Sequence, residues 1–292
     1  MNAITFSQVR KAFGAVQAVD GIDLTIPAGR SIALLGPNGA GKSTSISMLL
    51  GLAKIDSGEI SVFGETPAKA VEKGYVGAML QEAKLPSGLT VGEIADFVRG
   101  LYPAPLELAE LLELAGLTEL AGRRADTLSG GQAQRLRFAM AIAGSPRLLV
   151  LDEPTAAMDV ESRRLFWASM RDYAAGGRTV LFATHYLEEA DENADQVIVI
   201  AHGKVIAEGA PAEIKRMAGG RTVRFTLGEQ PSAGLDALPG VTAVEIHGAT
   251  VTLRTDDSDG TAEALFKKTT LKIRDLEITG AGLEDAFLSL TK

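Results

Sequence analysis

A glycine-rich segment constrains the fold of this chain more than any other feature of its sequence. An apolar run from Ser31 to Leu35 comes before it, and a helical pattern from Ser43 to Leu50 follows it. Loops of this type wrap their backbone amides around phosphate groups, while a lysine reaches the outer phosphates and a hydroxyl holds Mg²⁺. The segment therefore predicts a phosphate-binding loop at a helix N-terminus, which favours anions; the alternative is an ordinary turn before a buried helix. Its residues are Gly36, Pro37, Asn38, Gly39, Ala40, Gly41, Lys42, Ser43 and Thr44.

Apolar runs of strand length alternate with helical segments over most of the chain. From about residue 85 to 145 the apolar period becomes 3.6 residues, which predicts a helical insert. Within it, Thr90 caps one helix, Pro105 opens a second, and Gln132 to Ala143 form a third. The alternation predicts a mainly parallel sheet covered by helices, so we expect an α/β P-loop nucleotide-binding domain. The later strand-like runs are Gly58 to Phe63, Tyr75 to Leu80, Leu148 to Leu151, Thr179 to Ala183 and Val197 to Ile200.

The C-terminal part of the chain has a different pattern. Gly219 and Gly220 form a joint, so we expect an ATP-binding domain over residues 1–219 and an accessory domain over residues 220–292. Beyond the joint the predicted order is βαββαβ, which is the split βαβ arrangement of a small α+β domain, followed by a last helix.

Composition and charge exclude several classes of protein. Apolar residues make up 46% and charged residues 23%, as in ordinary globular proteins. The chain has no cysteine, which excludes disulfides and thiolate metal sites, and its formal net charge of −8 argues against a nucleic-acid-binding role. Residues 1–10 lack the pattern of a signal peptide, and no apolar run approaches the roughly 18 residues of a spanning helix. We expect another chain to supply the span if the protein works at a membrane.

Two carboxylates follow the apolar run from Leu148 to Leu151. Asp152 and Glu153 should emerge at the sheet edge where the phosphate-binding loop also lies. Asp152 suits the Mg²⁺ shell, and Glu153 is placed to orient and deprotonate a water that attacks the γ-phosphate. The alternative is that this Asp-Glu-Pro sequence only ends a strand.

A second segment rich in glycine precedes the helix from Gln132 to Ala143. It reads Ser129, Gly130, Gly131 and Gln132. Taken alone, Ser129 is either a plain helix cap followed by a tight turn, or part of a second anion site made by glycine amides, a hydroxyl and a helix N-terminus. The segment by itself leaves both interpretations open.

The three segments together resemble the ATP-binding subunits of ABC transporters, and the resemblance extends from Met1 to about Gly219 with the motifs in the family's order and spacing. It implies ATP and Mg²⁺ as cofactors and an ATPase that drives transport through a separate integral membrane permease. It also implies a homodimer in the ATP-bound state, in which the Ser129 segment binds the γ-phosphate held by the opposite subunit. The expected location is the cytoplasmic face of the cell membrane.

Four more positions match family motifs. The resemblance implies that Gln81 touches Mg²⁺ and water and senses the membrane partner, that His185 contacts the γ-phosphate as a switch, and that Phe13 stacks on adenine. The alternatives without a functional role are an exposed loop glutamine for Gln81, a surface histidine for His185 and a core phenylalanine for Phe13. Asp159 fits the loop that couples the two sites across the dimer, although Met158 stands where many relatives have glycine.

The tail resembles the C-terminal domain of ATPase subunits that serve drug, antibiotic and polysaccharide exporters. The resemblance is carried by its strand pattern and by the ending Leu283 to Leu288; the alternative is any amphipathic closing helix. We therefore expect export. A second candidate function is a soluble ABC-type ATPase that acts on ribosomes or DNA, but such proteins carry two ATPase cores or a long coiled-coil insert, and this chain has one core and no heptad run.

Overall fold

The computed structural model has two compact units, Met1–Ala210 and Pro211–Lys292. It describes residues 1–80, 85–156, 158–217, 220–227, 234–268, 271–280 and 282–291. The units separate after Ala210 because α8 (Pro211–Met217) packs against α10 (Leu283–Leu290) within the second unit. The domain boundary at residue 219 lies outside the described residues and stays a prediction.

The first unit is built around a sheet in the order β5-β6-β7-β3-β8-β9, counted over the described residues. Its first five strands are parallel, and β9 is antiparallel to β8. Every residue of β6 and β7 is buried, as expected for strands covered on both faces. The predicted α/β fold is therefore confirmed. The strands are β3 (Ser31–Leu35), β5 (Val76–Met79), β6 (Leu148–Asp152), β7 (Thr179–Ala183), β8 (Gln196–Ala201) and β9 (Lys204–Gly209).

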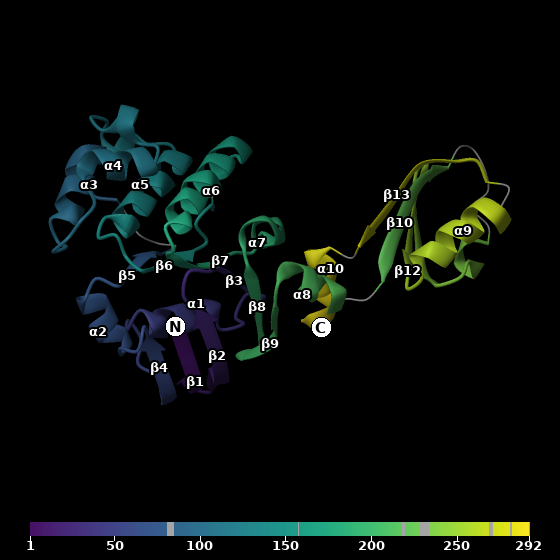
Figure 1. Ribbon diagram of the computed structural model, residues 1–292, viewed down its shortest axis with the longest axis horizontal. Helices are drawn as coiled ribbons and strands as arrows, with labels where there is room; N and C mark the ends of the chain where they lie inside the picture. Colours follow the sequence, from purple (N-terminus) through teal and green to yellow (C-terminus); the bar gives the residue numbers. More distant parts are fainter. Residues whose placement is uncertain are drawn as a thin grey trace. The chain divides into compact units, whose positions relative to one another are not determined.

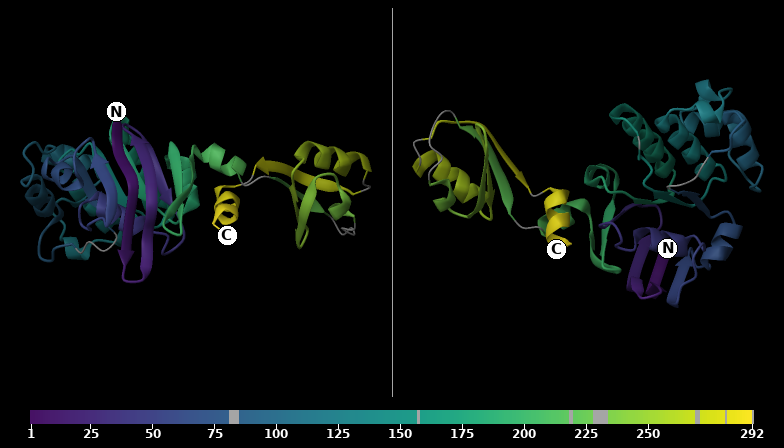
Figure 2. Two further views of the ribbon diagram at one scale, coloured as in Figure 1. Left: turned by 90° about the horizontal axis from the view of Figure 1, so that it is seen from below. Right: turned by 180° about the vertical axis from the view of Figure 1, so that it is seen from behind.

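A second, antiparallel sheet packs beside the first. It consists of β1 (Asn2–Phe13), β2 (Val16–Pro27) and β4 (Ser57–Val62), and Figure 2 shows β1 and β2 as a long hairpin. The alternating apolar residues of these strands share one core with α1 (Lys42–Leu49) and β3, so the helix after the glycine-rich segment is held from two sides.

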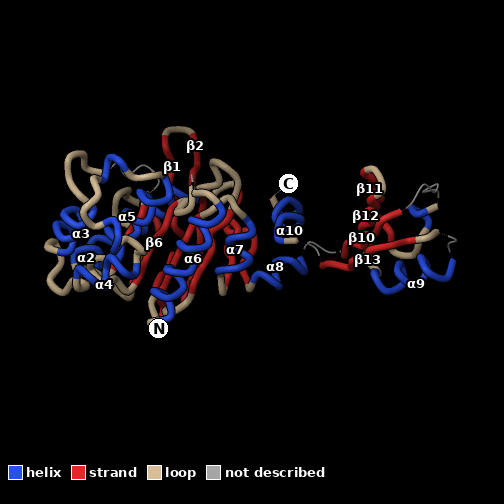
Figure 3. The backbone as a smooth tube through the Cα atoms, turned by 90° about the horizontal axis from the view of Figure 1, so that it is seen from above, coloured by secondary structure: helices blue, strands red, loops and turns tan. Residues whose placement is uncertain are grey.

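Three helices form the predicted insert and lie together in Figure 1: α3 (Val91–Arg99), α4 (Leu108–Leu114) and α5 (Gly130–Ile142). Thr90 caps α3 as predicted, because its hydroxyl accepts from the backbone N–H of Glu93 while the Glu93 carboxylate accepts from Thr90 N–H. The prediction that Pro105 opens the second helix is wrong, since Leu106 N–H donates to the Ala143 carbonyl and keeps this stretch outside α4. Figure 3 shows these helices together with α2 (Pro67–Glu72), α6 (Val160–Ala175) and α7 (Leu187–Asn193) of the same unit.

The second unit holds a sheet in the order β11-β12-β10-β13, with antiparallel neighbours throughout. Because β12 lies between β10 and β11, this is the predicted split βαβ order. Ala264 and Leu265 of α9 are buried with Val223 and Phe225 of β10. The elements are β10 (Arg221–Leu227), a 3₁₀ turn (Leu235–Ala237), β11 (Val241–His247), β12 (Thr250–Thr255), α9 (Ser258–Lys268) and β13 (Ile273–Gly280).

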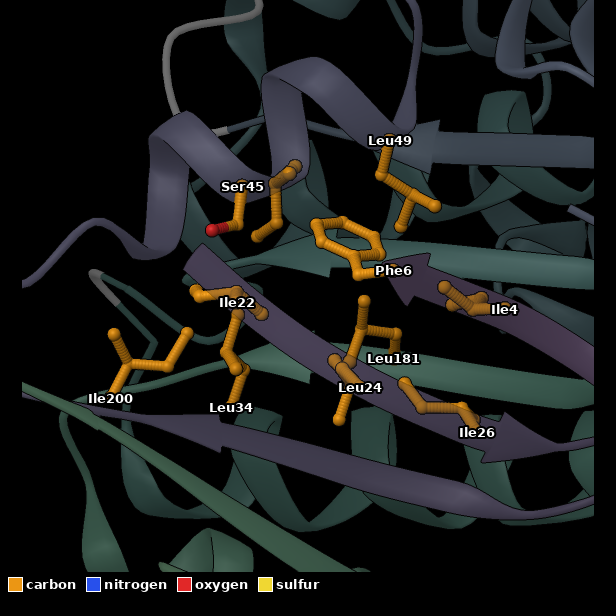
Figure 4. Close-up of a pocket in the computed structure, with 11 residues that line it drawn as sticks. Ile4, Phe6, Ile22, Leu24, Ile26, Leu34, Ser45, Leu49, Leu181 and Ile200 are labelled. Carbon is orange, nitrogen blue, oxygen red and sulfur yellow. The ribbon is translucent and has the colours of Figure 1, made fainter. Parts of the chain in front are cut away.

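A small apolar cavity of about 10 Å³ lies between the two sheets of the first unit and α1 (Figure 4). It has space for one water at most. Ser45 lines it together with apolar side chains such as Phe6 and Leu49. The Ser45 hydroxyl is buried and has no hydrogen-bond partner among the described residues. A buried hydroxyl of this kind costs about 1–3 kcal/mol.

Replacing Ser45 with alanine is expected to raise the free energy of unfolding by about 1 kcal/mol, and Tm by about 2–4 °C, because it removes this hydroxyl from an apolar site. The control is Ser47→Ala on the same helix. It gains the same helix propensity but loses the bond that the Ser47 hydroxyl donates to the Ser43 carbonyl at 2.7 Å, so little net change is expected. Thermal unfolding followed by circular dichroism measures both variants, and a lower Tm for Ser45→Ala would contradict the prediction.

Candidate functional site

The phosphate-binding loop connects β3 to α1, as predicted from its sequence. Gly41 has a φ of +106°, and a Cβ added there would lie 2.4 Å from the Ala18 carbonyl oxygen, so only glycine fits. The turn between β8 and β9 supports the loop, since Gly203 N–H donates to the Ala40 carbonyl at 3.1 Å. The backbone of the loop is thus fixed by neighbours outside it, which suits a site whose ligands are backbone amides.

The Lys42 side chain folds back onto the phosphate-binding loop. Its Nζ donates to the carbonyl oxygens of Gly36 at 2.6 Å and Pro37 at 3.2 Å. Burial lowers the pKa of Lys42, and the nearby negative charges of Glu153 and Asp152 oppose that shift. The ammonium group therefore lies between the loop and the two carboxylates, where phosphate oxygens would be stronger acceptors than carbonyls.

Asp152 ends β6 and is buried. Burial raises the pKa of Asp152, while a hydrogen bond with the Ser43 side chain and the charge of Lys42 oppose the shift. A hydroxyl and a carboxylate side by side are hard oxygen donors of the kind that Mg²⁺ takes, with phosphates and water completing its shell. Among the described residues no group of three or more His, Asp or Glu side chains forms a cage of its own. The pair fits a magnesium ion that arrives with a nucleotide.

Glu153 leaves the strand in an unusual conformation. Its φ of +52° lies in the left-handed region, at a cost of roughly 1–2 kcal/mol for a residue other than glycine. Its N–H donates to the Ala183 carbonyl at 2.9 Å, so the bend follows the end of β7. The bend brings Oε2 of Glu153 to 2.5 Å from Nδ1 of His185. When the carboxylate is ionised it can only accept, so Nδ1 of His185 is then the donor of this bond.

The structure brings together the predicted residues of one phosphate site. Lys42, Ser43, Asp152, Glu153 and His185 come from three strand ends of one sheet edge, because Leu34 of β3 and Asp152 of β6 both lie beside Ala183 of β7. The His185 side chain is 56% exposed, whereas that of Glu153 is 13% exposed. The site therefore has a largely buried carboxylate and an open side.

The Ser129 segment has the geometry of a helix cap. The Ser129 hydroxyl accepts from Gln132 N–H at 3.3 Å, and the Gln132 side chain accepts from Ser129 N–H at 3.0 Å. Ser129 and Gly130 are exposed at the N-terminus of α5. Among the described residues, no hydrogen bond or ion pair joins this segment to the phosphate-binding loop of the same chain. The cap interpretation holds, and the second anion site stays a prediction that needs another chain.

Asp159 caps α6. Its carboxylate accepts from Ser162 N–H at 2.7 Å, and the backbone and side-chain hydrogen bonds of Ser162 lower the pKa of Asp159. Gly131 lies so close to Ser162 that a Cβ there would be 2.9 Å from its Oγ, so Asp159 and the Ser129 segment are neighbours. Met158 is buried.

Two other predicted residues have different outcomes. Phe13 is 56% exposed at the end of β1, with Lys11 Nζ 5.3 Å from its ring centre, which excludes the core alternative and leaves the ring open for stacking. Gln81 lies outside the described residues.

Sequence reasoning missed a buried polar cluster beside this site, formed by Thr155, Thr184 and Glu189. Glu188 and Glu189 are adjacent residues of the same type. They differ in burial, because Glu188 is exposed and Glu189 is buried. No motif or period in the sequence signals that difference.

Comparison with known proteins gives matches over the whole chain. A family model described as ABC transporter matches residues 19–156. The chain is 38% identical to the daunorubicin/doxorubicin resistance ATP-binding protein DrrA of Streptomyces peucetius, over 99% of this chain and 92% of that protein. It is also 38% identical to the Nod factor export ATP-binding protein I of Paraburkholderia xenovorans, over 99% of this chain and 97% of that protein.

Solved structures match the fold. One described as the ATP-binding subunit of an ABC transporter has a TM-score of 0.66 at 26% identity and covers 73% of this chain and 92% of its own. A dimeric ATP-binding cassette in a post-hydrolysis state, bound to ADP and Pi, has a TM-score of 0.64 at 25% identity, over 71% of this chain and 98% of its own. With the phosphate loop and two carboxylates at one sheet edge and relatives matched along the whole chain, the protein belongs to the ATP-binding subunits of ABC transporters.

Proposed function

We propose that this ATPase powers export through a separate integral membrane permease. The observation that carries the proposal is the match of the chain, tail included, to proteins whose names specify drug resistance and Nod factor export. Because the match covers 99% of this chain, the C-terminal unit belongs to the resemblance as much as the phosphate site does. The substrate is set by the permease, and nothing in this chain specifies it.

The site supports hydrolysis of ATP with defined roles for its residues. The loop amides and Lys42 bind the phosphates, and Ser43 and Asp152 would hold Mg²⁺, which supplies positive charge beside them. Oε2 of Glu153 faces His185, so its other oxygen is left to accept the proton of the attacking water. The water oxygen bonds to the γ-phosphorus in line as the bond to ADP breaks. In this proposal His185 keeps the base oriented and contacts the γ-phosphate.

The exposed Ser129 segment supports a site shared by two copies of the chain. The Ser129 hydroxyl accepts from Gln132 N–H, so its own proton remains available to a phosphate oxygen. The N-terminus of α5, with Gly130 and Gly131 beside it, adds backbone N–H groups and a favourable dipole. We therefore assign ATP-bound chains to a homodimer in which each Ser129 segment completes the site of the other copy, with Asp159 and Phe13 in the roles implied by the family.

Among the described residues, no helix has both the length and the apolar character that crossing a bilayer requires. The proposed permease partner, inferred from the exporter relatives, places the chain at the cytoplasmic face of the membrane. The rival function, a soluble ATPase acting on ribosomes or DNA, has no second core in this chain to support it.

Affinity purification from detergent-solubilised membranes tests the proposal. A tagged chain is expected to bring down a multi-span membrane protein, and the Lys42→Ala variant should do the same, because docking does not require phosphate binding. Recovery of the chain with ribosomes or DNA, and with no multi-span protein from solubilised membranes, would favour the rival function.

A further inference from the structure

We propose that Glu189 is a positioning residue of the ATP site: its buried carboxylate holds the segment that carries Glu153 and the turn that carries His185 at a fixed separation. The proposal rests on the hydrolytic roles proposed above for Glu153 and His185. It adds a residue that touches neither nucleotide nor water and acts through two threonines.

The contacts of Glu189 connect these two segments directly. Glu189 lies on α7 and is 3% exposed. Its Oε1 accepts from the Thr155 hydroxyl, and its Oε2 accepts from the Thr184 hydroxyl at 2.7 Å. Thr155 comes two residues after Glu153, and Thr184 comes just before His185. Each carboxylate oxygen thus holds one of the two segments, and both threonines are buried.

The turn around His185 is held on both sides. Before it, Thr184 Oγ1 also accepts from Tyr186 N–H at 3.0 Å. After it, the Arg163 guanidinium of α6 lies 4.4 Å from the centre of the Tyr186 ring. The His185 ring, in contrast, is exposed and contacts Glu153 and Tyr186. The orientation of His185 therefore depends on the residues that flank it.

The charge of Glu189 is balanced within the same cluster. Arg163 Nε lies 3.5 Å from Glu189 Oε1, so the guanidinium that stacks on Tyr186 also faces the buried carboxylate. Buried carboxylates persist when hydrogen bonds and a nearby opposite charge compensate them. Here the two threonine hydroxyls supply the hydrogen bonds, and Arg163 supplies the charge through a contact that is not a hydrogen bond. The consequence is a rigid link from α6 and α7 to the two strand ends that carry Glu153 and His185.

The test uses Thr184→Val and Thr155→Val, which remove one hydroxyl each and keep the shape. The matched control is Thr179→Val, at the opposite end of β7, where an equally buried threonine accepts from Gly29 N–H at 3.0 Å. In the full chain, kcat for ATP is expected to fall roughly tenfold in the two test variants with KM changed less than twofold, since a misplacement of about 1 Å can cost roughly 10²-fold and loss of one hydroxyl should move the reacting groups by less than that. Thr179→Val should change stability and leave kcat unaffected.

A spectroscopic readout separates positioning from general destabilisation. The chain has three histidines, at positions 185, 202 and 247, so NMR of histidine-labelled protein resolves each ring. Thr184→Val is expected to move the His185 resonances and to leave those of His202 and His247 in place. Thr184→Ser, which restores the hydroxyl, should return both kcat and the His185 resonances to near wild-type values.

Three outcomes would overturn the proposal: the test variants behave like Thr179→Val, the His185 resonances stay in place, or serine fails to rescue. If Thr184→Val does not fold, Thr155→Val and Thr155→Ser provide the same comparison. Glu153→Gln measured in parallel separates a failure of the proposed hydrolytic roles from a failure of the positioning role of Glu189. Normal turnover in that variant refutes the proposed hydrolytic role, whereas a dead Glu153→Gln beside unaffected threonine variants refutes positioning alone.

Discussion

Turnover of ATP is expected to fall by roughly 10² or more when Glu153 is replaced by glutamine, while ATP binding persists. The amide has the shape of the carboxylate and can still accept from His185 Nδ1, but it cannot take the proton of the attacking water. The phosphate-binding loop and Lys42 are unchanged, so affinity for ATP should remain near wild type. Because bound ATP is no longer consumed, a stable ATP-bound dimer should appear on size-exclusion columns.

Single-turnover hydrolysis and nucleotide-binding assays measure the two effects separately. Glu188→Gln is the control, since this exposed glutamate of α7 loses the same charge at a position outside the site. It should retain turnover and should not accumulate the dimer. Wild-type turnover in Glu153→Gln would remove Glu153 from its role as the base.

The second large effect is a recovery of activity on mixing two dead variants. Lys42→Ala should disable a site through the chain that holds the phosphates, because it removes a positive charge beside them. Ser129→Arg should disable a site through the opposite chain, because it fills the narrow space where glycine amides must approach. With either variant alone, a dimer would have two dead sites, so neither ATP-dependent closure nor hydrolysis is expected.

In a mixture, a dimer of unlike chains has one site that combines an intact Lys42 from one copy with an intact Ser129 from the other. That site is chemically complete. The mixture should therefore regain ATP-dependent dimer closure and, where one site suffices for turnover, part of the hydrolysis that neither variant shows alone. The measurements are size-exclusion chromatography and phosphate release at several mixing ratios.

Ser129→Asp provides a matched variant. Aspartate caps a helix about as well as serine, so α5 should keep its N-terminus, whereas arginine loses about 1 kcal/mol of capping. Its carboxylate repels the partner's phosphate instead of filling space, and it should give the same recovery with Lys42→Ala. If neither pair recovers while all variants stay folded, the shared site is refuted unless the two sites cannot act singly. Counting nucleotides on the mixed dimer decides between those cases.

The elements predicted best are those whose local sequence agrees with their surroundings. The runs Ser31–Leu35 and Thr179–Ala183 match β3 and β7 at both ends, because buried central strands need apolar residues throughout and turn residues beyond. The apolar alternation from Ile4 to Val9 covers only part of β1, because the polar end of this strand is held by pairing with β2 and has no apolar pattern. β9, whose residues are mostly not buried, was missed for the same reason.

Some residues of the candidate site could be predicted from the local sequence, and others could not. The positions of the residues assigned to the nucleotide site through a fixed motif, such as Lys42 and Ser43, could be predicted from the sequence because the motif encodes a loop conformation. The left-handed backbone of Glu153 and the burial of Glu189 depend on contacts with β7 and with Thr155, which are distant in sequence. Tertiary contacts of that kind have no signature in local periodicity.

The left-handed conformation of Glu153 sets stability against activity at a single position. Glycine or asparagine would adopt that φ with little strain, so a glutamate there lowers the stability of the fold. Glycine or asparagine at residue 153 would therefore make the fold more resistant to heat. The same substitution would remove the carboxylate proposed to act in ATP hydrolysis.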